Sequence, residues 1–288
     1  MTLRLKDRLF VASQYLAPHH ALSRLAGALA ESEWGPLKRR FISTFARHYQ
    51  VNMSEAERPN LDDYRNFNDF FTRSLTADAR SFPDDARTLC SPVDGSVSQA
   101  GAITDGRIIQ AKQQSFTVTE LLGGDAEQAR RYRDGEFATL YLSPKDYHRI
   151  HMPCDGTLVR TTFVPGRLFS VNGTTAEAVP RLFARNERLV CEFQTERGRM
   201  VMVLVGAMIV ASIETTWAGV VAPMRRQIQH LNYNNPQLTF SRGEEMGRFR
   251  LGSTVVMLFE PNTLAWSEAI SPGKQVQLGQ PLEDSIGL

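Results

Sequence analysis

Residues 91–101 read Ser-Pro-Val-Asp-Gly-Ser-Val-Ser-Gln-Ala-Gly, and their pattern sets the character of most of the chain. An Asp-Gly pair follows an apolar residue and leads into a short run of small, alternating residues. Residues 153–158, Pro-Cys-Asp-Gly-Thr-Leu, repeat the pattern. Asp-Gly pairs favour tight turns, and short alternating runs favour strands. Both segments therefore predict a strand that is entered through an Asp-Gly turn.

The chain keeps this texture from about residue 89 to its end. Short apolar runs lie between Gly, Pro, Asp and Asn, and we expect helices only over 119–133 and 174–184. The most apolar run, residues 200–213, is shorter than the roughly 20 residues that cross a membrane. Its Val and Ile content favours one or two buried strands. These features predict a β-rich catalytic domain, a barrel or sandwich, over residues 76–288.

The first 75 residues have a different, helical pattern. Apolar residues recur at helical spacing over 5–16, 22–29 and 37–49, with a break at Trp34-Gly35-Pro36. The predicted fold class is therefore α+β, with amphipathic N-terminal helices followed by the β-rich domain.

Positive charge is concentrated in these helices. The first fifty residues carry eight basic and three acidic side chains, a net charge of +5, against +2 for the whole chain. Such helices either pack on the core or lie in a membrane interface, where basic residues attract anionic lipid. Both interpretations stay open, and they can coexist. The small total charge argues against nucleic acid as a partner.

Two further features limit the classes of protein to which the chain can belong. Charged residues interrupt the apolar ones in residues 1–13, so we expect no signal peptide. Cys90, Cys154 and Cys191 have neither zinc-site nor disulfide-framework spacing, which favours buried, reduced thiols.

Residues 147–153, Tyr-His-Arg-Ile-His-Met-Pro, hold two of the six histidines. His148 and His151 could form a metal pair on a helix with a third ligand. The surrounding prolines favour a strand instead, and no Glu lies between the histidines as in zinc proteases. In a strand, residues three apart face opposite sides, so one histidine could face a site while the other packs elsewhere.

Residues 245–256, Glu-Met-Gly-Arg-Phe-Arg-Leu-Gly-Ser-Thr-Val-Val, are the second group with reactive side chains. Gly252-Ser253 alone is a common turn dipeptide, and it lacks the Gly-x-Ser-x-Gly pattern of hydrolases. This segment indicates a function only when it is considered together with other segments of the chain.

Together, several segments resemble the bacterial, pyruvoyl-dependent phosphatidylserine decarboxylase family. They occur in the family's order over nearly the whole chain, and Gly173 stands where some members have His or Pro. The matching segments are FNDFFTR (67–73), SPVDG (91–95), YHRIHMP (147–153), VPGRLFSVN (164–172), LFARNER (182–188), VGAMIVASIETTWAG (205–219) and GEEMGRFRLGST (243–254).

The resemblance implies a proenzyme that cuts itself between Gly252 and Ser253. It assigns Ser253 as the nucleophile, His151 as its base and Asp94 as the group that orients the imidazole, a charge relay acting on the chain's own backbone. A β chain, 1–252, and an α chain, 253–288, would result. Ser253 would become a covalent pyruvoyl group, the only cofactor, with no metal.

The resemblance also implies the reaction. The pyruvoyl group would form a Schiff base with phosphatidylserine, release CO₂ and yield phosphatidylethanolamine, acting as an electron sink. His148 is the candidate for substrate positioning or proton transfer. A lipid substrate implies a peripheral protein on the anionic, cytoplasmic face of the bacterial inner membrane, and the family suggests a homodimer.

Other functions remain open from the residues. One alternative is a pyruvoyl-dependent decarboxylase of a soluble amino acid, which the basic N-terminus disfavours. A second is a non-catalytic, lipid-binding β domain, which the intact Asp94, His151 and Ser253 disfavour. A third is a metalloenzyme using His148 and His151, which lacks an obvious third ligand.

Overall fold

The N-terminal region is helical, as predicted. In this computed structural model, residues 4–111, 114–208, 212–221, 227–233, 238–250 and 253–284 are described. The first elements are α1 (Leu5–Leu16), α2 (His19–Ala30), α3 (Gly35–Tyr49), the 3₁₀ turn η1 (Leu61–Asp63) and α4 (Phe67–Phe71). Pro18 stands between α1 and α2, and Pro36 lies in the first turn of α3, where its missing N–H costs no hydrogen bond.

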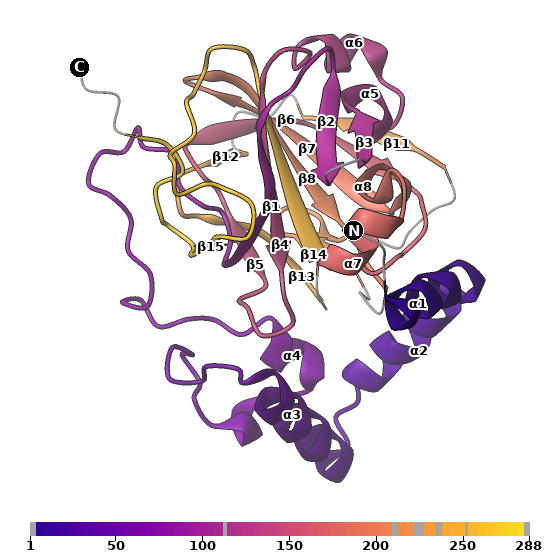
Figure 1. The fold of residues 1–288 in the computed structure, drawn as a ribbon. Coiled ribbons are helices and arrows are strands. Elements are labelled where there is room, and N and C mark those ends of the chain that lie inside the picture. Colours follow the sequence, from indigo (N-terminus) through magenta and orange to yellow (C-terminus); the bar gives the residue numbers. More distant parts are fainter. Residues whose placement is uncertain are drawn as a thin grey trace.

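The rest of the described chain is dominated by antiparallel strands (Figure 1). The strands are β1 (Gly95–Ala102), β2 (Arg107–Ala111), β3 (Gln114–Thr117), β4 (Glu136–Leu142), β5 (Arg149–His151), β6 (Gly156–Val164), β7 (Arg188–Thr195), β8 (Gly198–Val205), β9 (Ile213–Thr215), β10 (Gly219–Val220), β11 (Gln229–Asn232), β12 (Thr239–Phe240), β13 (Glu245–Phe249), β14 (Ser253–Phe259) and β15 (Gln275–Val276). Both Asp-Gly segments lead into strands, β1 and β6, as predicted.

The main sheet is open rather than closed. Its order is β11-β6-β7-β8-β14-β4-β1-β15, with β12 also pairing with β6, and its end strands β11 and β15 do not pair with each other in the described part. A smaller sheet has the order β10-β9-β13-β5, and β2 and β3 form a hairpin. The α+β class is confirmed. The barrel form of the prediction is wrong, because the strands at the two ends of the large sheet are not joined.

The two helices expected inside the β region are each split in two. The first becomes α5 (Val118–Leu121) and α6 (Ala126–Arg130), because Gly123 and Gly124 adopt φ of 81° and 99°, outside helical geometry. The second becomes α7 (Gly173–Ala178) and α8 (Leu182–Arg185), with Pro180 between them. The apolar run 200–213 forms most of β8 and the start of β9, as predicted.

The large sheet has a hydrophobic core on each face. Val255 and Met257 of β14 belong to one core, together with Ile150 and Phe249 of the smaller sheet. Val256 and Leu258, the alternate residues of the same strand, belong to the other core, beneath α5–α8. Since side chains alternate along a strand, Ser253 faces the first core, between the two sheets.

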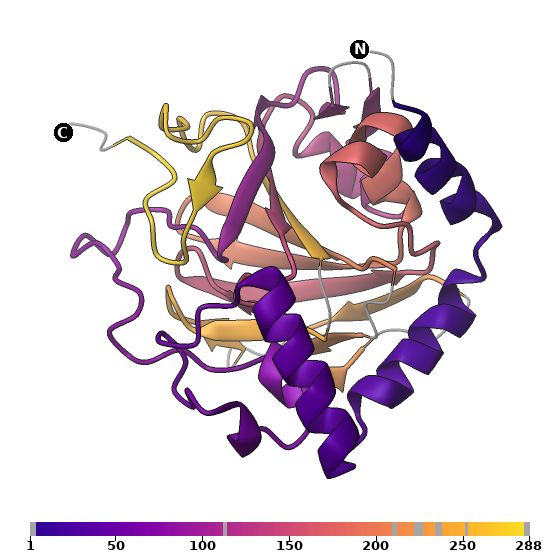
Figure 2. The ribbon, with the colours of Figure 1, turned by 60° about the horizontal axis from the view of Figure 1, so that its bottom comes forward.

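The N-terminal helices contact one end of the β region (Figure 2). Gln14 of α1 accepts a hydrogen bond from the backbone N–H of Ser170 at 3.1 Å. His20 of α2 donates to the Gly166 carbonyl at 3.0 Å. Helices α1 and α2 are therefore attached to residues 166–170, which belong to one of the family-like segments.

Much of the apolar surface of these helices stays in solvent. Leu5, Leu9, Leu16, Leu25 and Leu29 are between 49% and 87% exposed. In the described part of the chain, no helix is both long enough and apolar enough to span a membrane. The exposed leucines keep the interfacial interpretation open.

Candidate active site

Ser253 is the first residue of β14, and β4 and β8 flank that strand in the sheet. It is opposite Leu142 of β4 and is only 1% exposed. Its hydroxyl oxygen has no hydrogen-bond partner among the described residues. A buried hydroxyl without a partner is costly, and such groups concentrate at reactive sites. Gly252, the other residue of the predicted scissile bond, lies outside the described residues.

His151 ends β5, and both of its ring nitrogens have partners. Nδ1 lies 2.7 Å from the Gly243 carbonyl, so it carries a proton and donates. Nε2 lies 3.0 Å from the Tyr147 hydroxyl and, in the neutral ring, accepts from it. Burial lowers the pKa of His151, which keeps the ring neutral and its Nε2 lone pair basic.

Asp94 lies directly before β1, but its carboxylate does not bond to His151. It accepts hydrogen bonds from Arg80, by Nε at 2.9 Å and by a second guanidinium nitrogen. It also accepts the Leu278 backbone N–H at 2.9 Å. The charge of Asp94 raises the pKa of His151, a smaller effect than burial. In this structure Asp94 thus acts on His151 through its charge, without a hydrogen bond between them.

The predicted relay therefore lacks direct contacts in this state. Ser253 and His151 share no hydrogen bond, and neither do His151 and Asp94, among the described residues. The roles of Asp94, His151, Ser253 and Gly252 stay predictions.

His148 is completely buried just before β5. Its Nδ1 donates to the Asp146 carbonyl at 2.8 Å, and its Nε2 has no partner among the described residues. The ring packs on Phe71 of α4, with centroids 4.0 Å apart. Burial, helped by the charge of Arg73, lowers the pKa of His148 to about 3. His148 is thus a neutral ring with an unused acceptor nitrogen.

The two histidines have different surroundings, which bears on the metal alternative. His148 lies against α4, whereas His151 bonds to Tyr147 and Gly243. Within the described ranges, no three His, Cys, Asp or Glu side chains are grouped to hold a metal ion.

An apolar cavity of about 320 Å³ lies between the helical region and the large sheet. Leu142, the strand partner of Ser253, is part of its wall. Its other lining residues are Phe45, Tyr49, Phe71, Tyr141, Pro144, Ser170, Val171, Asn172, Ala207 and Met208. Residues of α3 and α4 and of the segments 170–172 and 207–208 thus line a cavity that borders the strand partner of Ser253. A Cβ at Gly173, beside this wall, would meet nothing within 4 Å, so the residue could be larger without a clash.

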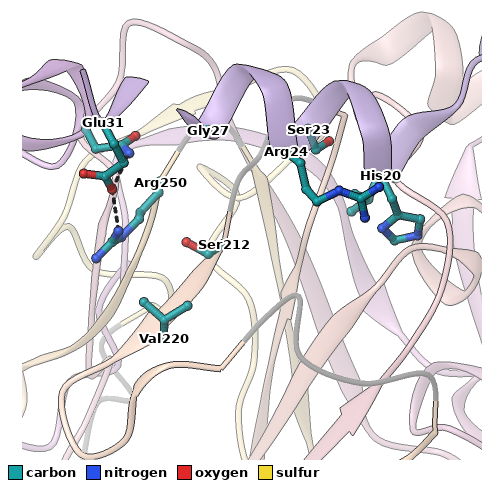
Figure 3. Close-up of a pocket in the computed structure, with 10 residues that line it drawn as sticks. His20, Ser23, Arg24, Gly27, Glu31, Ser212, Val220 and Arg250 are labelled. Atoms are coloured by element: carbon teal, nitrogen blue, oxygen red, sulfur yellow. Dashed lines mark hydrogen bonds and ion pairs between the residues drawn. The ribbon is translucent and has the colours of Figure 1, made fainter. Parts of the chain in front are cut away.

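A second cavity, of about 370 Å³, lies under α2 and is crossed by an ion pair (Figure 3). Arg250, two residues before Gly252, contacts Glu31 at the end of α2 at 2.7 Å. Arg250 also pairs with Glu214 of β9 at 3.0 Å. The segment that leads to the predicted scissile bond is thus connected to the helical region.

Sequence reasoning missed several residues around the predicted site. Tyr147 and Gly243 were inside the quoted segments, but only the fold shows them at the His151 ring. Arg80 lies in no motif, although it is the main partner of Asp94. Its only sequence signal is its type, since a buried carboxylate needs a cation.

Comparison with known proteins identifies the family. A family model described as phosphatidylserine decarboxylase matches residues 67–283, and one described as PSD matches residues 9–50. The chain belongs to the phosphatidylserine decarboxylase family. A phosphatidylserine decarboxylase proenzyme of Marinobacter nauticus is 57% identical over 95% of this chain and 96% of the relative. Proenzymes of the same name from Hahella chejuensis and Ectopseudomonas mendocina are 56% and 55% identical, over 97% and 96% of this chain and 95% and 98% of the relatives.

Membership of the phosphatidylserine decarboxylase family confirms the resemblance seen in the sequence. It also confirms the expected class of enzyme, a decarboxylase, that is, a carboxy-lyase. The comparisons favour neither the decarboxylase of a soluble amino acid nor the non-catalytic lipid-binding domain.

Proposed function

We propose that this decarboxylase first cuts its own chain between Gly252 and Ser253 and then converts phosphatidylserine to phosphatidylethanolamine. The observation that carries the proposal is the Ser253 hydroxyl, which is buried at the start of a core strand and has no partner in the described part of the chain. A surface turn serine would have no reason to be desolvated in this way.

The cleavage step uses only groups of the chain. The Ser253 oxygen attacks the Gly252 carbonyl carbon, and the peptide C–N bond is replaced by an ester. Removal of the Ser253 α-proton then breaks the ester Cβ–O bond, which leaves a carboxylate on Gly252 and dehydroalanine at 253. Addition of water and loss of ammonia give the pyruvoyl group at the start of the α chain.

His151 is the base in this proposal. Its Nδ1 is held by the Gly243 carbonyl, which leaves Nε2 as the atom that can take a proton. Nε2 has one lone pair and Tyr147 occupies it, so the Tyr147 hydroxyl must give way to Ser253 or relay the proton. Asp94 would act through its charge, which favours the imidazolium formed when His151 is protonated.

The surroundings of Ser253 fit a pyruvoyl cofactor. When formed, that group supplies an electrophilic carbonyl that holds the substrate amine and accepts the electron pair left when CO₂ departs. The cavity beside Leu142 supplies a largely apolar surface near this residue. His148 offers a neutral Nε2 that no described residue contacts by a hydrogen bond, which suits an atom that holds a proton or positions the substrate.

The substrate also requires access to lipid. The basic N-terminal helices expose leucines and border the apolar cavity through α3, which supports docking of residues 1–75 on an anionic membrane. We place the enzyme at the cytoplasmic face of the bacterial inner membrane, with residues 76–288 as the catalytic domain. A homodimer remains a prediction from the family.

Mass spectrometry of the purified, denatured protein tests the proposed self-cleavage. We expect two chains, 1–252 and 253–288, the second beginning with a pyruvoyl group, whereas Ser253→Ala stays intact and inactive. A full-length chain in fully active enzyme would overturn the proposal.

A separate assay tests the lipid substrate. The cleaved enzyme should release CO₂ from phosphatidylserine vesicles and not from free serine. Equal release from both would favour the soluble amino acid as substrate.

A further inference from the structure

A third cavity, of about 330 Å³, lies beside Asp94 and Tyr147 and contains three cationic side chains. Residues 50–55, 73–80, 94–95, 145–147 and 275–277 contribute to its wall. The cations are Arg73, Arg80 and Lys145, and the carboxylates are Glu55, Asp94 and Asp146. The pairing of these groups decides what the cavity can bind.

Two of the three carboxylates pair with Arg80. Its guanidinium contacts Asp94 directly and Glu55 at 2.9 Å, and these contacts raise the pKa of Arg80. Asp146 is occupied locally, because it accepts the backbone N–H and the hydroxyl of Ser143, each at 2.7 Å. Burial also raises the pKa of Asp146, which weakens its charge. None of these carboxylates pairs with Arg73 within the described ranges.

Arg73 is a buried cation that forms no ion pair with any residue that the structure describes. It follows α4 directly and is 3% exposed. One N–H donates to the Lys145 carbonyl at 3.2 Å, while Nε has no hydrogen-bond partner in the described part of the chain. Desolvation lowers the pKa of Arg73, and the charges of Asp94 and Glu55, with which it forms no ion pair, offset this only in part. A buried guanidinium in this state costs free energy unless an anion arrives.

The position of Arg73 links the cavity to the candidate active site. Its charge lowers the pKa of His148, and Tyr147, the partner of His151, borders the same cavity. An anion bound by Arg73 would thus lie next to the residues that the proposed mechanism uses.

We propose that Arg73 is the anchor of a phosphate-binding site that takes the phosphate group of the phospholipid headgroup. The inference rests on the proposed function, since it assigns one part of that substrate to one side chain. A guanidinium presents paired N–H donors that match two phosphate oxygens, and Lys145 adds a second, more exposed charge.

The chemistry favours the phosphate over the substrate's carboxylate. The carboxylate loses its charge as CO₂, so a cation bound to it would stabilise the ground state more than the transition state. The phosphodiester keeps its charge throughout the reaction. An arginine bound there holds the substrate without raising the barrier of the chemical step.

The binding test uses Ser253→Ala protein, which separates this inference from self-cleavage and decarboxylation. Inorganic phosphate, glycerophosphoserine and free serine are titrated while the melting temperature is followed. We expect phosphate and glycerophosphoserine to raise the melting temperature and serine to leave it unchanged. Adding Arg73→Gln should remove both shifts. Arg65→Gln, an exposed arginine on the same segment paired with Glu33, is the matched control and should keep them.

Each other outcome overturns the assignment. A shift with inorganic phosphate but not glycerophosphoserine would indicate a site for free phosphate. An equal shift with free serine would mean that the amino acid part is recognised. Shifts that persist in Arg73→Gln would remove Arg73 from the site.

Kinetics of the cleaved enzyme provide the second readout. With phosphatidylserine in detergent micelles, Arg73→Gln should raise KM on the order of ten- to hundredfold and change kcat little. If Arg73→Gln does not fold, Arg73→Lys keeps the charge without the paired donors and should show a KM raised about tenfold. A fall in kcat at unchanged KM in either variant would contradict the inference.

Discussion

In the N-terminal helices leucines stand in solvent, whereas in the large sheet even polar side chains are buried. Leu16 of α1 is 87% exposed and Leu25 of α2 is 61% exposed. Ser253 and Thr254 of β14 are at most 1% exposed, and neither hydroxyl has a partner in the described part of the chain. The helices leave apolar surface uncovered, and the sheet leaves polar groups unsatisfied. Each departs from what stability alone would favour, which supports the two tasks proposed above, contact with lipid for the helices and chemistry for the sheet.

The largest expected effect lies on the sheet side of this comparison. His151→Gln should slow self-cleavage on the order of 10²- to 10⁴-fold, because the proposed base is lost. Time-resolved gels of newly made protein measure the rate. Tyr147→Phe frees Nε2 of His151. If the hydroxyl only gives way to Ser253, the cleavage rate of this variant should stay within about tenfold of the rate of the unchanged protein. Cleavage of His151→Gln at the normal rate would remove His151 from the proposed mechanism.

The next effect lies on the helix side. Changing Leu22, Leu25 and Leu29 of α2 together to Gln should weaken binding to anionic vesicles on the order of a hundredfold, because three apolar side chains no longer enter the interface. Co-sedimentation with vesicles measures it. Ile109→Gln, at a half-exposed apolar residue of β2, is the control and should bind normally. Unchanged binding of the triple variant would mean that these helices pack on the β region and do not dock on the membrane.

Acid should lower the free energy of unfolding through the buried His148 of the β region. In unfolded chain a histidine takes a proton near pH 6.5, but His148 in the fold does so only near pH 3. Below pH 6.5 the unfolded state therefore binds more protons, and the free energy of unfolding falls by up to about 1.4 kcal/mol per pH unit for this group. Between pH 7 and 5 the loss is about 2 kcal/mol, and the slope from His148 fades as the pH rises above 7.

Urea unfolding at pH 7 and pH 5 measures this loss. His148→Gln should lose less stability on acidification than the unchanged protein. His48→Gln, at an exposed histidine of α3, should behave like the unchanged protein. Equal losses in all three proteins would show that His148 is not held neutral by burial.

The smallest effect concerns the contact between the two regions. The Glu31–Arg250 pair is 48% and 30% exposed, so water screens it, and a double-mutant cycle should give less than about 1 kcal/mol. Glu33→Gln provides the matched control, since Glu33 pairs with Arg65 instead. A coupling energy above about 2 kcal/mol would mean that the helices and the strand leading to the cleavage site unfold as one unit.

Local signals in the sequence predicted the elements better than their assembly. Pro18 and Trp34-Gly35-Pro36 marked the helix boundaries, and the Asp-Gly turns marked β1 and β6. The Gly123-Gly124 break was also local, and a single predicted helix overlooked it. The open sheet could not be predicted from the sequence, since pairing of β14 with β4 and β8 joins residues that are 49 or more positions apart.

The candidate site shows the same limit. Motifs located Asp94, His148, His151 and Ser253, because their residue types and neighbours are characteristic of the family. The partner of Asp94 could not be predicted, since Arg80 lies in no motif and meets Asp94 only through the fold. Arg73 stood inside a matching segment, but its lack of an ion-pair partner among the described residues is a property of the folded cavity.

The central claim is that the buried hydroxyl of Ser253, which has no partner within the described ranges, is the group that cuts the chain. Intact-mass measurement of the unchanged protein, Ser253→Ala and Thr254→Ala tests it most directly. Thr254 is an equally buried neighbour whose hydroxyl also lacks a partner among the described residues but faces the opposite core. We predict two chains divided at Gly252–Ser253 in the unchanged protein and in Thr254→Ala, and one chain in Ser253→Ala. Cleavage of Ser253→Ala at the same bond would contradict the account.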